Sequence, residues 1–341
     1  MGFFCVFYLN FSIKYDIIYV YVNFREERQM KAKILAVVGP TVSGKSALAI
    51  EIAKRFNGEI ICCDSMQIYK QMNIGTAKPD GEELNSAVHH LFDFADPKVS
   101  FSCADYIPLA ERVVEDILSR GKLPIFCGGT GLYLDRFLSG AEFESTEVDE
   151  NFRREMNAFA LEFGNEALHQ KLREIDPKSA DEIHPNNVKR VIRALEIYKT
   201  SGRTKSEIDR ESKEFSSKYD CLQIGIKYED RELLYDRINL RVDKMMQAGL
   251  IDETRKLLEA GVFEANATAA QAIGYKELLS YFNNEKTLIC AVEDLKMATR
   301  RYAKRQMTWF SAHGNVNWLV ADNKNIAELV FEAEQIIKEF I

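Results

Sequence analysis

Gly39-Pro40-Thr41-Val42-Ser43-Gly44-Lys45-Ser46 is the stretch that decides the fold of this chain. It reads G-x-x-x-x-G-K-[ST], the phosphate-binding P-loop. The apolar run 34–38 before it is typical of a buried parallel strand, and apolar residues at helical spacing follow it as far as Gly58. A strand, a glycine-rich loop and a helix in this order predict a site where backbone N–H groups and a helix N-terminus hold phosphate oxygens. The alternative is an ordinary glycine turn between a strand and a helix.

Two residues of the loop carry specific chemistry. Lys45 supplies a mobile cation for the phosphates, and the Ser46 hydroxyl is a candidate ligand of Mg²⁺. Arg237 and Arg241 lie four residues apart in a predicted helix over 231–246, so they share one face, and two guanidinium groups suit a diphosphate. The predicted phosphate-binding residues are therefore Gly39, Pro40, Thr41, Val42, Ser43, Gly44, Lys45, Ser46 and Arg237. The motif alone does not identify the molecule that carries the phosphates.

The composition is that of an ordinary globular protein with about two domains. The chain has 341 residues, of which 46% are hydrophobic and 28% are charged. Its net charge of −7 excludes a uniformly basic nucleic-acid-binding protein, so any such site must come from local patches. The seven cysteines include no C-x-x-C pair. This pattern predicts buried thiols in a reducing cytoplasm rather than disulfides or zinc.

Residues 1–29 form a segment crowded with aromatic side chains. It lacks the basic start of a signal peptide, and Lys14 and Asp16 divide it, so it is a poor membrane span. Met30 directly precedes the first predicted core strand. We therefore expect the natural start at Met30, with residues 1–29 as a non-native or disordered extension. A peripheral hydrophobic anchor is the alternative.

The ends of two further predicted strands carry candidate site residues. Asp64 follows the strand at 59–63, and ligand groups in α/β sheets gather at the carboxyl ends of strands, so Asp64 is expected near the P-loop. A helix N-cap is the alternative role for this aspartate. The strand at 123–127 ends in Gly128-Gly129-Thr130-Gly131, where a P-loop ATPase usually has an aspartate for its Mg²⁺ shell. This departure weakens the prediction of an NTPase.

The pattern between the predicted strands divides the chain. A helical pattern from 149 to 219 interrupts the α/β pattern, which returns with a strand at 221–226, and a polar, acidic stretch at 139–147 marks a junction. The predicted fold is therefore an α/β, P-loop NTPase-like parallel sheet core flanked by helices, with an inserted all-helical domain. The expected parts are 30–143 (core, first part), 144–220 (helical insertion) and 221–341 (core, second part, with C-terminal helices).

Two basic stretches are candidates for contact with RNA. Between 187 and 205, six basic residues occur with one acid, Glu196. Phosphate contact is the functional interpretation, and a solvated helix face is the alternative. Between 296 and 305, five basic residues occur with no acid, and Tyr302 and the nearby Trp309 interleave with them, which fits RNA contact. Trp309 alone is more often a core residue.

Nine motifs in one order resemble the tRNA dimethylallyltransferase (tRNA isopentenyltransferase) family. They are the P-loop at 39–46, Asp-Ser-x-Gln-x-Tyr at 64–69, Asn-Ile-Gly-Thr-Ala-Lys-Pro at 73–79, Gly-Gly-Thr-Gly-Leu-Tyr at 128–133, His-Pro-Asn-Asn at 184–187, Arg-Ala-Leu-Glu at 193–196, Arg-Val-Asp-x-Met-Met at 241–246, Gly-Tyr-Lys-Glu at 274–277 and Lys-Arg-Gln-Met-Thr-Trp-Phe at 304–310. The match runs from about Met30 almost to the end of the chain.

The resemblance implies an activity and roles for these residues. A dimethylallyl group would pass from dimethylallyl diphosphate to the exocyclic amine of the adenosine 3′-adjacent to the anticodon of a tRNA, with Mg²⁺ as cofactor. Thr41 to Ser46 would hold the donor diphosphate and Asp64 would be the general base, with Thr41, Lys45 and Arg241 as the other catalytic residues. The residues implied in tRNA contact are Asp64, Ser65, Met66, Gln67, Thr130, Arg153, Lys189, Arg190, Val191, Ile192, Arg193, Gln271, Ala272, Ile273, Gly274, Tyr275 and Lys276.

This chemistry agrees with the residue types. The exocyclic amine of adenine is a weak nucleophile, and a carboxylate that removes its proton contributes typically ~10²–10⁴ in rate. The expected partners are tRNA and dimethylallyl diphosphate, with no membrane, for a monomer in the cytoplasm. Two alternatives are a P-loop kinase for a nucleotide or small metabolite, and a nucleotide-dependent RNA-binding module whose role would survive the loss of Asp64.

Overall fold

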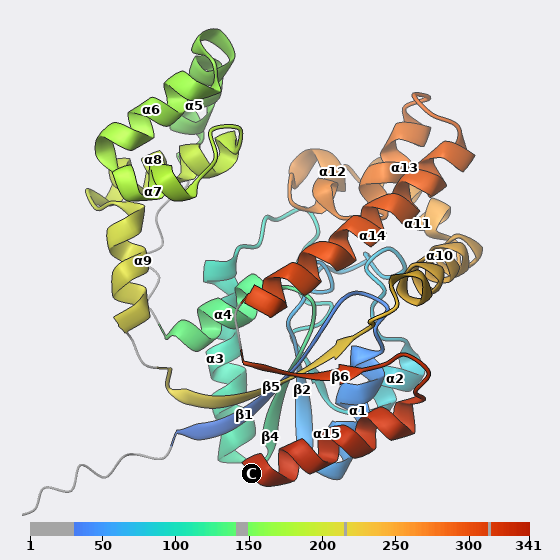
Figure 1. Ribbon diagram of the computed structural model, residues 1–341. Coiled ribbons are helices and arrows are strands. Elements are labelled where there is room, and N and C mark those ends of the chain that lie inside the picture. The colour runs from blue at the N-terminus through green and yellow to red at the C-terminus, as the bar shows by residue number, and fades with distance from the viewer. Residues whose placement is uncertain (1–30, 141–148, 215–216, 313–314) are drawn as a thin grey trace, which may run out of the picture. The chain divides into compact units, whose positions relative to one another are not determined.

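Six parallel strands form the sheet on which the site is built (Figure 1). The computed structural model describes residues 31–140, 149–214, 217–312 and 315–341. The sheet order is β3-β2-β4-β1-β5-β6, and each neighbouring pair is parallel. The strands are β1 (Ala32–Val38), β2 (Gly58–Cys62), β3 (His89–His90), β4 (Leu123–Cys127), β5 (Tyr219–Lys227) and β6 (Val316–Val320). The predicted parallel α/β core is therefore confirmed.

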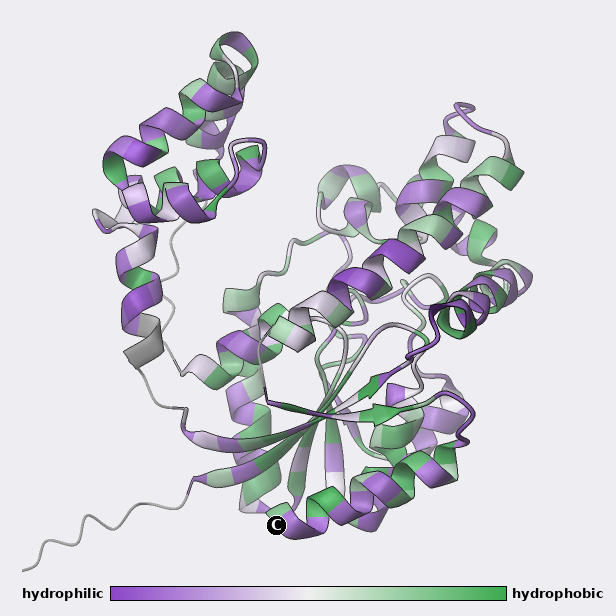
Figure 2. Ribbon diagram, in the orientation of Figure 1, coloured by the Kyte–Doolittle hydropathy of each residue, from purple (hydrophilic) through white to green (hydrophobic). Residues whose placement is uncertain are grey.

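Helices cover both faces of this sheet. Successive residues of β1 point to opposite faces, so they pack in two different core clusters. Leu35 and Val37 pack in one core cluster with residues of α1 (Lys45–Arg55) and α15 (Ile326–Phe340). Ile34 and Ala36 pack in a second cluster with α3 (Cys103–Ser119) and α4 (Gly131–Ser139). Figure 2 shows the strands mainly in the colour of hydrophobic residues, whereas the helices alternate between the two colours.

A third core cluster supports the segments that line the site. It joins Ile68, Tyr69 and Met72, which follow β2, to buried residues of the C-terminal helices such as Val242 and Tyr275. The helices of this region are α10 (Arg231–Gln247), α11 (Leu250–Glu259), α12 (Val262–Ala265), α13 (Tyr275–Phe282) and α14 (Leu288–Ala312), with the 3₁₀ turn η1 (Ala269–Gln271) and, earlier in the chain, α2 (Gly81–Ser86). Residues Ala32–Ile341 form one compact unit by their internal contacts.

The insertion between α4 and β5 is helical, as predicted, and has a hydrophobic core of its own. Leu168, Leu172, Val191 and Leu195 are nearly inaccessible within it, and the buried His169 Nε2 lies 2.9 Å from the Ala180 carbonyl oxygen. Its helices are α5 (Glu150–Phe163), α6 (Asn165–Ile175), α7 (Pro177–Glu182), α8 (Val188–Ser201) and α9 (Lys205–Glu214). A separate core explains how this segment can interrupt the sheet without disturbing it.

Some details differ from the sequence-based expectations. β5 begins at Tyr219 rather than 221, because Tyr219 pairs with Ala32 and its ring stacks on Phe137. The short edge strand β3 was not predicted. The extension at 1–29 and most of the junction at 139–147 lie outside the described residues, so the proposed domain limits stay predictions.

The six described cysteines are all free thiols, and three of them, Cys62, Cys63 and Cys127, are buried. Within the part of the chain that the structure describes, no helix is both long enough and apolar enough to cross a membrane.

Candidate active site

A cavity of about 280 Å³ lies where the P-loop, the turn after β2 and the end of β4 meet helices α10 and α14. Thr41, Lys45, Ser46, Asp64 and Arg241 all line it. These residues come from distant parts of the chain and meet because the carboxyl ends of parallel strands lie at one edge of the sheet. The predicted proximity of Asp64 to the P-loop is therefore confirmed.

The P-loop has the backbone conformation of an anion cradle. Gly44, at the N-terminus of α1, has φ 94°, and Val42 has φ 68°, which is unusual for a β-branched residue. The Lys45 ammonium donates to the Pro40 carbonyl at 3.3 Å. The Ser43 hydroxyl is buried and has no hydrogen-bond partner among the described residues. An unsatisfied hydroxyl beside a lysine and a helix N-terminus fits a phosphate group.

Burial affects both cations of the cavity. Burial lowers the pKa of Lys45, and the charge of the nearby Asp64 acts in the opposite direction. Burial likewise lowers the pKa of Arg241. Two partly desolvated cations that also repel each other gain strongly from an anion placed between them. The electrostatics of the site therefore favour an anionic ligand such as a diphosphate.

The two arginines of α10 have different surroundings. Arg241 lines the cavity. Arg237 donates from Nε to the Val42 carbonyl of the P-loop at 3.4 Å, and its guanidinium lies 5.7 Å from the centre of the Tyr228 ring. The shared helix face predicted for the pair thus brings one guanidinium into the cavity and the other against the backbone of the loop.

Asp64 organises the turn after β2. Its Oδ1 accepts hydrogen bonds from the backbone N–H groups of Met66 at 2.9 Å and Gln67 at 3.4 Å. No helix begins here, so the alternative role of a helix N-cap is wrong. Its Oδ2 has no hydrogen-bond partner among the described residues. One oxygen is thus held in place while the other stays available to a substrate.

Thr130 joins the end of β4 to the same turn. Its hydroxyl oxygen accepts a hydrogen bond from the Ser65 N–H at 3.0 Å. Two residues of α14 that line the cavity, Tyr302 and Gln306, were not among the predicted site residues, and Tyr302 was considered only with the basic stretch at 296–305. Gln306 accepts from the Thr41 N–H at 2.8 Å and donates to the Gly129 carbonyl at 3.1 Å. Their spacing of four residues on one helix face was the signal available in the sequence.

The loop at 73–79 forms another wall of the cavity, and Glu253 of α11, also missed in the sequence, holds it. The Glu253 carboxylate accepts hydrogen bonds from the N–H groups of Asn73, Ile74 and Gly75 at 2.9–3.0 Å, and from the Tyr275 hydroxyl at 2.7 Å. Gly75 packs so closely on Tyr275 that a Cβ there would lie 2.5 Å from the ring. The carboxylate therefore joins this loop to the predicted RNA-contacting segment at 271–276.

Gln67 is a second support of the same loop. Its Nε2 donates to the carbonyls of Thr76 at 3.0 Å and Ala77 at 2.9 Å. The other predicted RNA-contacting residues near the cavity are of two kinds. Tyr275 is fully buried and does not line the cavity, whereas Ser65, Met66, Gln271, Ala272 and Ile273 do.

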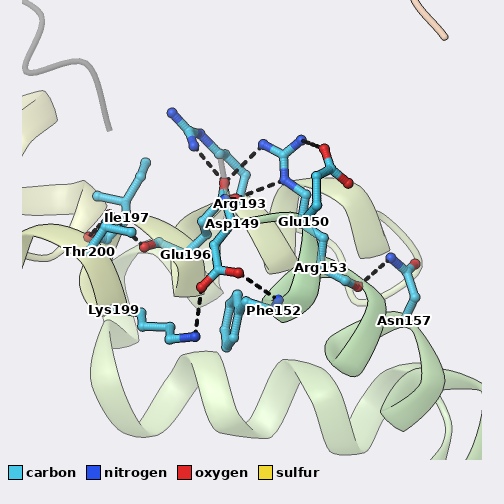
Figure 3. A network of polar contacts seen from close by, with 10 residues as sticks. All are labelled: Asp149, Glu150, Phe152, Arg153, Asn157, Arg193, Glu196, Ile197, Lys199 and Thr200. Atoms are coloured by element: carbon cyan, nitrogen blue, oxygen red, sulfur yellow. Dashed lines mark hydrogen bonds and ion pairs between the residues drawn. The ribbon is translucent and has the colours of Figure 1, made fainter. Parts of the chain in front are cut away.

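In the insertion, a buried carboxylate organises the basic residues around it (Figure 3). Glu196, fully buried, accepts from the Asp149 N–H at 3.0 Å and from Arg153 at 2.8 and 2.9 Å, and it pairs with Arg193 at 2.5 Å. Lys199 pairs with Asp149 at 2.8 Å. Arg153 and Arg193, both implied in RNA contact, therefore also compensate a buried charge.

The basic surplus predicted for 187–205 is smaller in the folded protein. Arg203 pairs with Glu211, and Lys205 pairs with Asp209. Both acids lie in α9, beyond the stretch 187–205 in which the charges were counted. Lys189 and Arg190 are exposed and have no ion-pair partner among the described residues. Val191 and Ile192 are buried in the core of the insertion. An RNA contact by the side chains of this segment thus depends mainly on its first residues.

The second basic stretch is also changed by tertiary contacts. Lys296 pairs with Asp243 at 3.0 Å and Glu293 at 3.2 Å, and Arg300 donates to Asn239 at 2.7 Å. Trp309 is partly buried and donates to Asp135 at 2.7 Å, so it is a packing residue, in agreement with the alternative stated for it.

Known proteins resemble this chain over most of its length. A family profile described as "IPP transferase" matches residues 67–313, and another described as "Isopentenyl transferase" matches residues 32–93. A tRNA dimethylallyltransferase of Acetivibrio thermocellus is 51% identical over 299 residues, which cover 88% of this chain and 95% of the relative.

Solved structures give the same result. The tRNA isopentenylpyrophosphate transferase of Bacillus halodurans has a TM-score of 0.68 and 44% identity, covering 91% of this chain and 96% of its own. A eukaryotic dimethylallyltransferase described as acting on tRNA has a TM-score of 0.73 and 32% identity, covering 85% of this chain and 74% of its own. The order of motifs, the parallel sheet and these similarities together show that the chain belongs to the tRNA dimethylallyltransferase family.

Proposed function

We propose that this chain transfers the dimethylallyl group of dimethylallyl diphosphate to the exocyclic amine of the adenosine 3′-adjacent to the anticodon in tRNA. The observation that carries the proposal is one cavity that holds a P-loop cation, Lys45, and a carboxylate with a free oxygen, Asp64. The first suits an allylic diphosphate, and the second suits an amine that must lose a proton. The family membership supports the same reaction.

Each group then has a defined task. The amine nitrogen forms a bond to the allylic carbon while the bond from that carbon to the diphosphate oxygen breaks, and Asp64 takes the amine proton. Lys45 and Arg241 stabilise the negative charge that grows on the leaving diphosphate. The adenine must leave its stack to present its amine, so the cavity has to accept a flipped base.

A magnesium ion fits this arrangement with few protein ligands. Ser46 places a hydroxyl in the cavity, and Mg²⁺ commonly combines one or two protein oxygens with substrate phosphates and water. Among the described residues there is no group of three or more histidine, cysteine, aspartate or glutamate side chains that would hold a metal without substrate. When bound, the ion would neutralise charge on the diphosphate.

The partners and the compartment follow from the same proposal. Exposed Lys189 and Arg190 supply phosphate contacts for tRNA. The free thiols support a reducing cytoplasm, and we propose a monomer, which light scattering of the purified protein would test.

The direct test is incubation of the protein with labelled dimethylallyl diphosphate and bulk tRNA. Label should enter the RNA, and nuclease digestion should release it as isopentenyladenosine. Heat-treated protein serves as the control. Absence of label from the RNA in the presence of folded protein and Mg²⁺ would reject the proposal.

The kinase alternative predicts consumption of ATP, and we expect none at a useful rate. The end of β4, where an NTPase has its aspartate, carries Cys127, and burial raises the pKa of this thiol to about 11. A neutral thiol cannot replace a carboxylate in the shell of Mg²⁺. Phosphate release from ATP should therefore stay far below diphosphate release from dimethylallyl diphosphate. ATP turnover that exceeds prenyl transfer and disappears in Lys45→Ala would favour a kinase or NTPase.

A further inference from the structure

Gln306 is a buried side chain of α14, and the two polar atoms of its amide group contact two separate loops. It is 4% exposed. Its Oε1 accepts a hydrogen bond from the Thr41 N–H at 2.8 Å, and its Nε2 donates to the Gly129 carbonyl at 3.1 Å. Thr41 belongs to the P-loop, which is the donor side of the proposed reaction. Gly129 precedes Thr130, which binds Ser65 beside Asp64, so it belongs to the acceptor side.

The packing around Gly129 leaves no freedom for this amide. A Cβ on Gly129 would lie 1.9 Å from the Gln306 Nε2. Gly129 does not have the positive φ that would itself demand glycine, so space for Gln306 is the reason for glycine here. The Tyr302 hydroxyl, one helical turn earlier, lies beside the same glycine, because a Cβ on Gly129 would be 3.8 Å from it. The amide is therefore fixed by its contacts with both loops.

We propose that Gln306 is a positioning residue that sets the distance between the donor loop and the acceptor loop during prenyl transfer. This inference rests on the proposed function. Gln306 acts through Thr41 and Gly129, and the reacting atoms need near-attack alignment because small displacements in such sites cost large factors in rate. Its loss therefore affects how well the two substrates are aligned.

Misalignment has a chemical consequence that can be measured. If the amine is out of line, water can attack the allylic carbon instead. The bond from carbon to the diphosphate oxygen breaks, the water oxygen forms the new bond, and the water loses a proton. The products are then dimethylallyl alcohol and diphosphate, so diphosphate is released without label entering the RNA.

The first experiment compares Gln306→Met, which keeps the length and loses both hydrogen bonds, with Gln306→Glu, which keeps an acceptor for Thr41 and loses the donor for Gly129. Gln335→Glu, an exposed position of α15, is the matched control. We expect kcat to fall at least about tenfold in Gln306→Met, with KM for tRNA changed by less than about threefold. The ratio of diphosphate released to label in RNA should rise above that of the parent protein.

The second experiment reaches the same contact from the other side. Gly129→Ala should displace the Gln306 amide and reproduce both defects. In the double variant Gly129→Ala, Gln306→Ala, the added methyl group finds space, so the pair should cost no more than Gln306→Ala alone. Fully additive effects would overturn the proposal. So would a kcat within about threefold of the parent in Gln306→Met, with an unchanged product ratio.

A third measurement needs no substrate and separates this inference from the proposed function. Hydrogen exchange at the Thr41 amide should be faster in Gln306→Met than in the parent, because its acceptor is lost. Unchanged exchange would show that Gln306 does not protect the Thr41 amide, whatever the activity of the protein. If the parent transfers no label but exchange is faster in the variant, the reaction assigned to the chain fails and the link between the two loops stands.

Discussion

At the scale of single residues, Asp64 divides two tasks between its two oxygens. Oδ1 accepts the Met66 and Gln67 N–H groups and fixes the turn, while Oδ2 has no partner in the part of the chain that the structure describes. A side-chain amide at this position can repeat the first task, because its oxygen still accepts. It cannot accept the amine proton, the task that we propose for Oδ2, because an amide does not take up a proton near neutral pH.

Asp64→Asn should therefore reduce turnover by at least ~10² while the dissociation constant of tRNA changes by less than about threefold. Single-turnover label transfer and a filter-binding assay measure the two quantities. Asp220→Asn, an exposed position of β5, is the control and should behave as the parent does. Turnover of Asp64→Asn within about threefold of the parent would remove Asp64 from the mechanism.

At the scale of elements, α11 acts on the cavity through one side chain. The Glu253 carboxylate satisfies three consecutive N–H groups of the loop at 73–75 and the Tyr275 hydroxyl. Hydrogen bonds to a charged acceptor contribute about 1.5–3 kcal/mol each, net of the bonds to water that they replace, and less where the groups are exposed. A helix outside the sheet thus fixes a wall of the site.

Glu253→Gln should loosen this loop, because the new NH₂ group faces backbone donors. We expect faster hydrogen exchange at the Asn73 to Gly75 amides and a loss of kcat/KM of roughly tenfold, equivalent to about 1.4 kcal/mol. Asp252→Asn, which removes a neighbouring exposed carboxylate paired with Arg255, is the matched control. Exchange rates equal to those of the control would show that the carboxylate does not hold the loop.

Helix α8 is the second element with a testable role. Lys189 and Arg190 are its exposed cations without an ion-pair partner among the described residues, whereas Arg193 pairs with the buried Glu196. Replacing Arg193 would leave the buried Glu196 carboxylate with less charge compensation. A loss of RNA binding could then not be separated from a loss of stability. The variant that tests RNA contact therefore spares Arg193.

We expect tRNA binding to weaken with salt despite the net charge of −7. Each phosphate contact contributes roughly 0.7–0.9 to the slope of log K against log salt, so Lys189→Gln, Arg190→Gln should flatten the slope by about 1.5. Arg173→Gln, an exposed cation of α6 paired with Asp181, is the control. A slope that does not change would show that both residues lie on a solvated helix face and do not contact tRNA phosphates.

At the scale of the whole molecule, a buried acid at the start of β2 contributes to stability through ion pairs whose members do not line the cavity. Glu59 is 1% exposed and pairs with Lys122 and His90 at 2.7 Å and with Arg120 through both oxygens. Hydrogen bonds from Arg120, with those from Lys122 and His90, hold the pKa of Glu59 well below its ordinary value, against the effect of burial. The folded state therefore favours the ionised carboxylate.

This shift has a defined sign. A carboxyl group with a depressed pKa in the folded state stabilises the protein above its unfolded pKa of about 4.3, and the stabilisation is lost as the pH falls below that value. Glu59→Gln should lower the free energy of unfolding by about 2 kcal/mol at pH 7, a figure below that of a fully buried pair because Arg120 and Lys122 are partly exposed. The difference from the parent should shrink toward pH 3.

Urea denaturation at pH 7, 5 and 3 measures this difference. Glu259→Gln, an exposed glutamate of α11, should show no such dependence on pH. A difference between Glu59→Gln and the parent that stays constant from pH 7 to pH 3 would contradict the linkage argument.

Much of the fold follows from short-range patterns in the sequence. The P-loop, the apolar runs of β1, β2 and β4 and the amphipathic repeat of α10 are local signals, so each of these elements was predicted nearly in place. The placement of Asp64 beside Lys45 also followed, because the carboxyl ends of parallel strands must share one edge. The sequence therefore determined the class of the fold and the shared position of the P-loop lysine and the Asp64 carboxylate, which we propose as anion site and general base.

Tertiary structure alone decided how charges and amides are paired. Glu196 of α8 pairs with Arg153 of α5, and Glu253 and Gln306 contact backbone groups more than 170 residues away. No local pattern encodes such contacts, because they depend on which elements the folded chain brings together and on whether water is excluded there. For the same reason a count of basic residues overestimated the exposed positive charge, since acids distant in sequence or on the next turn neutralise it.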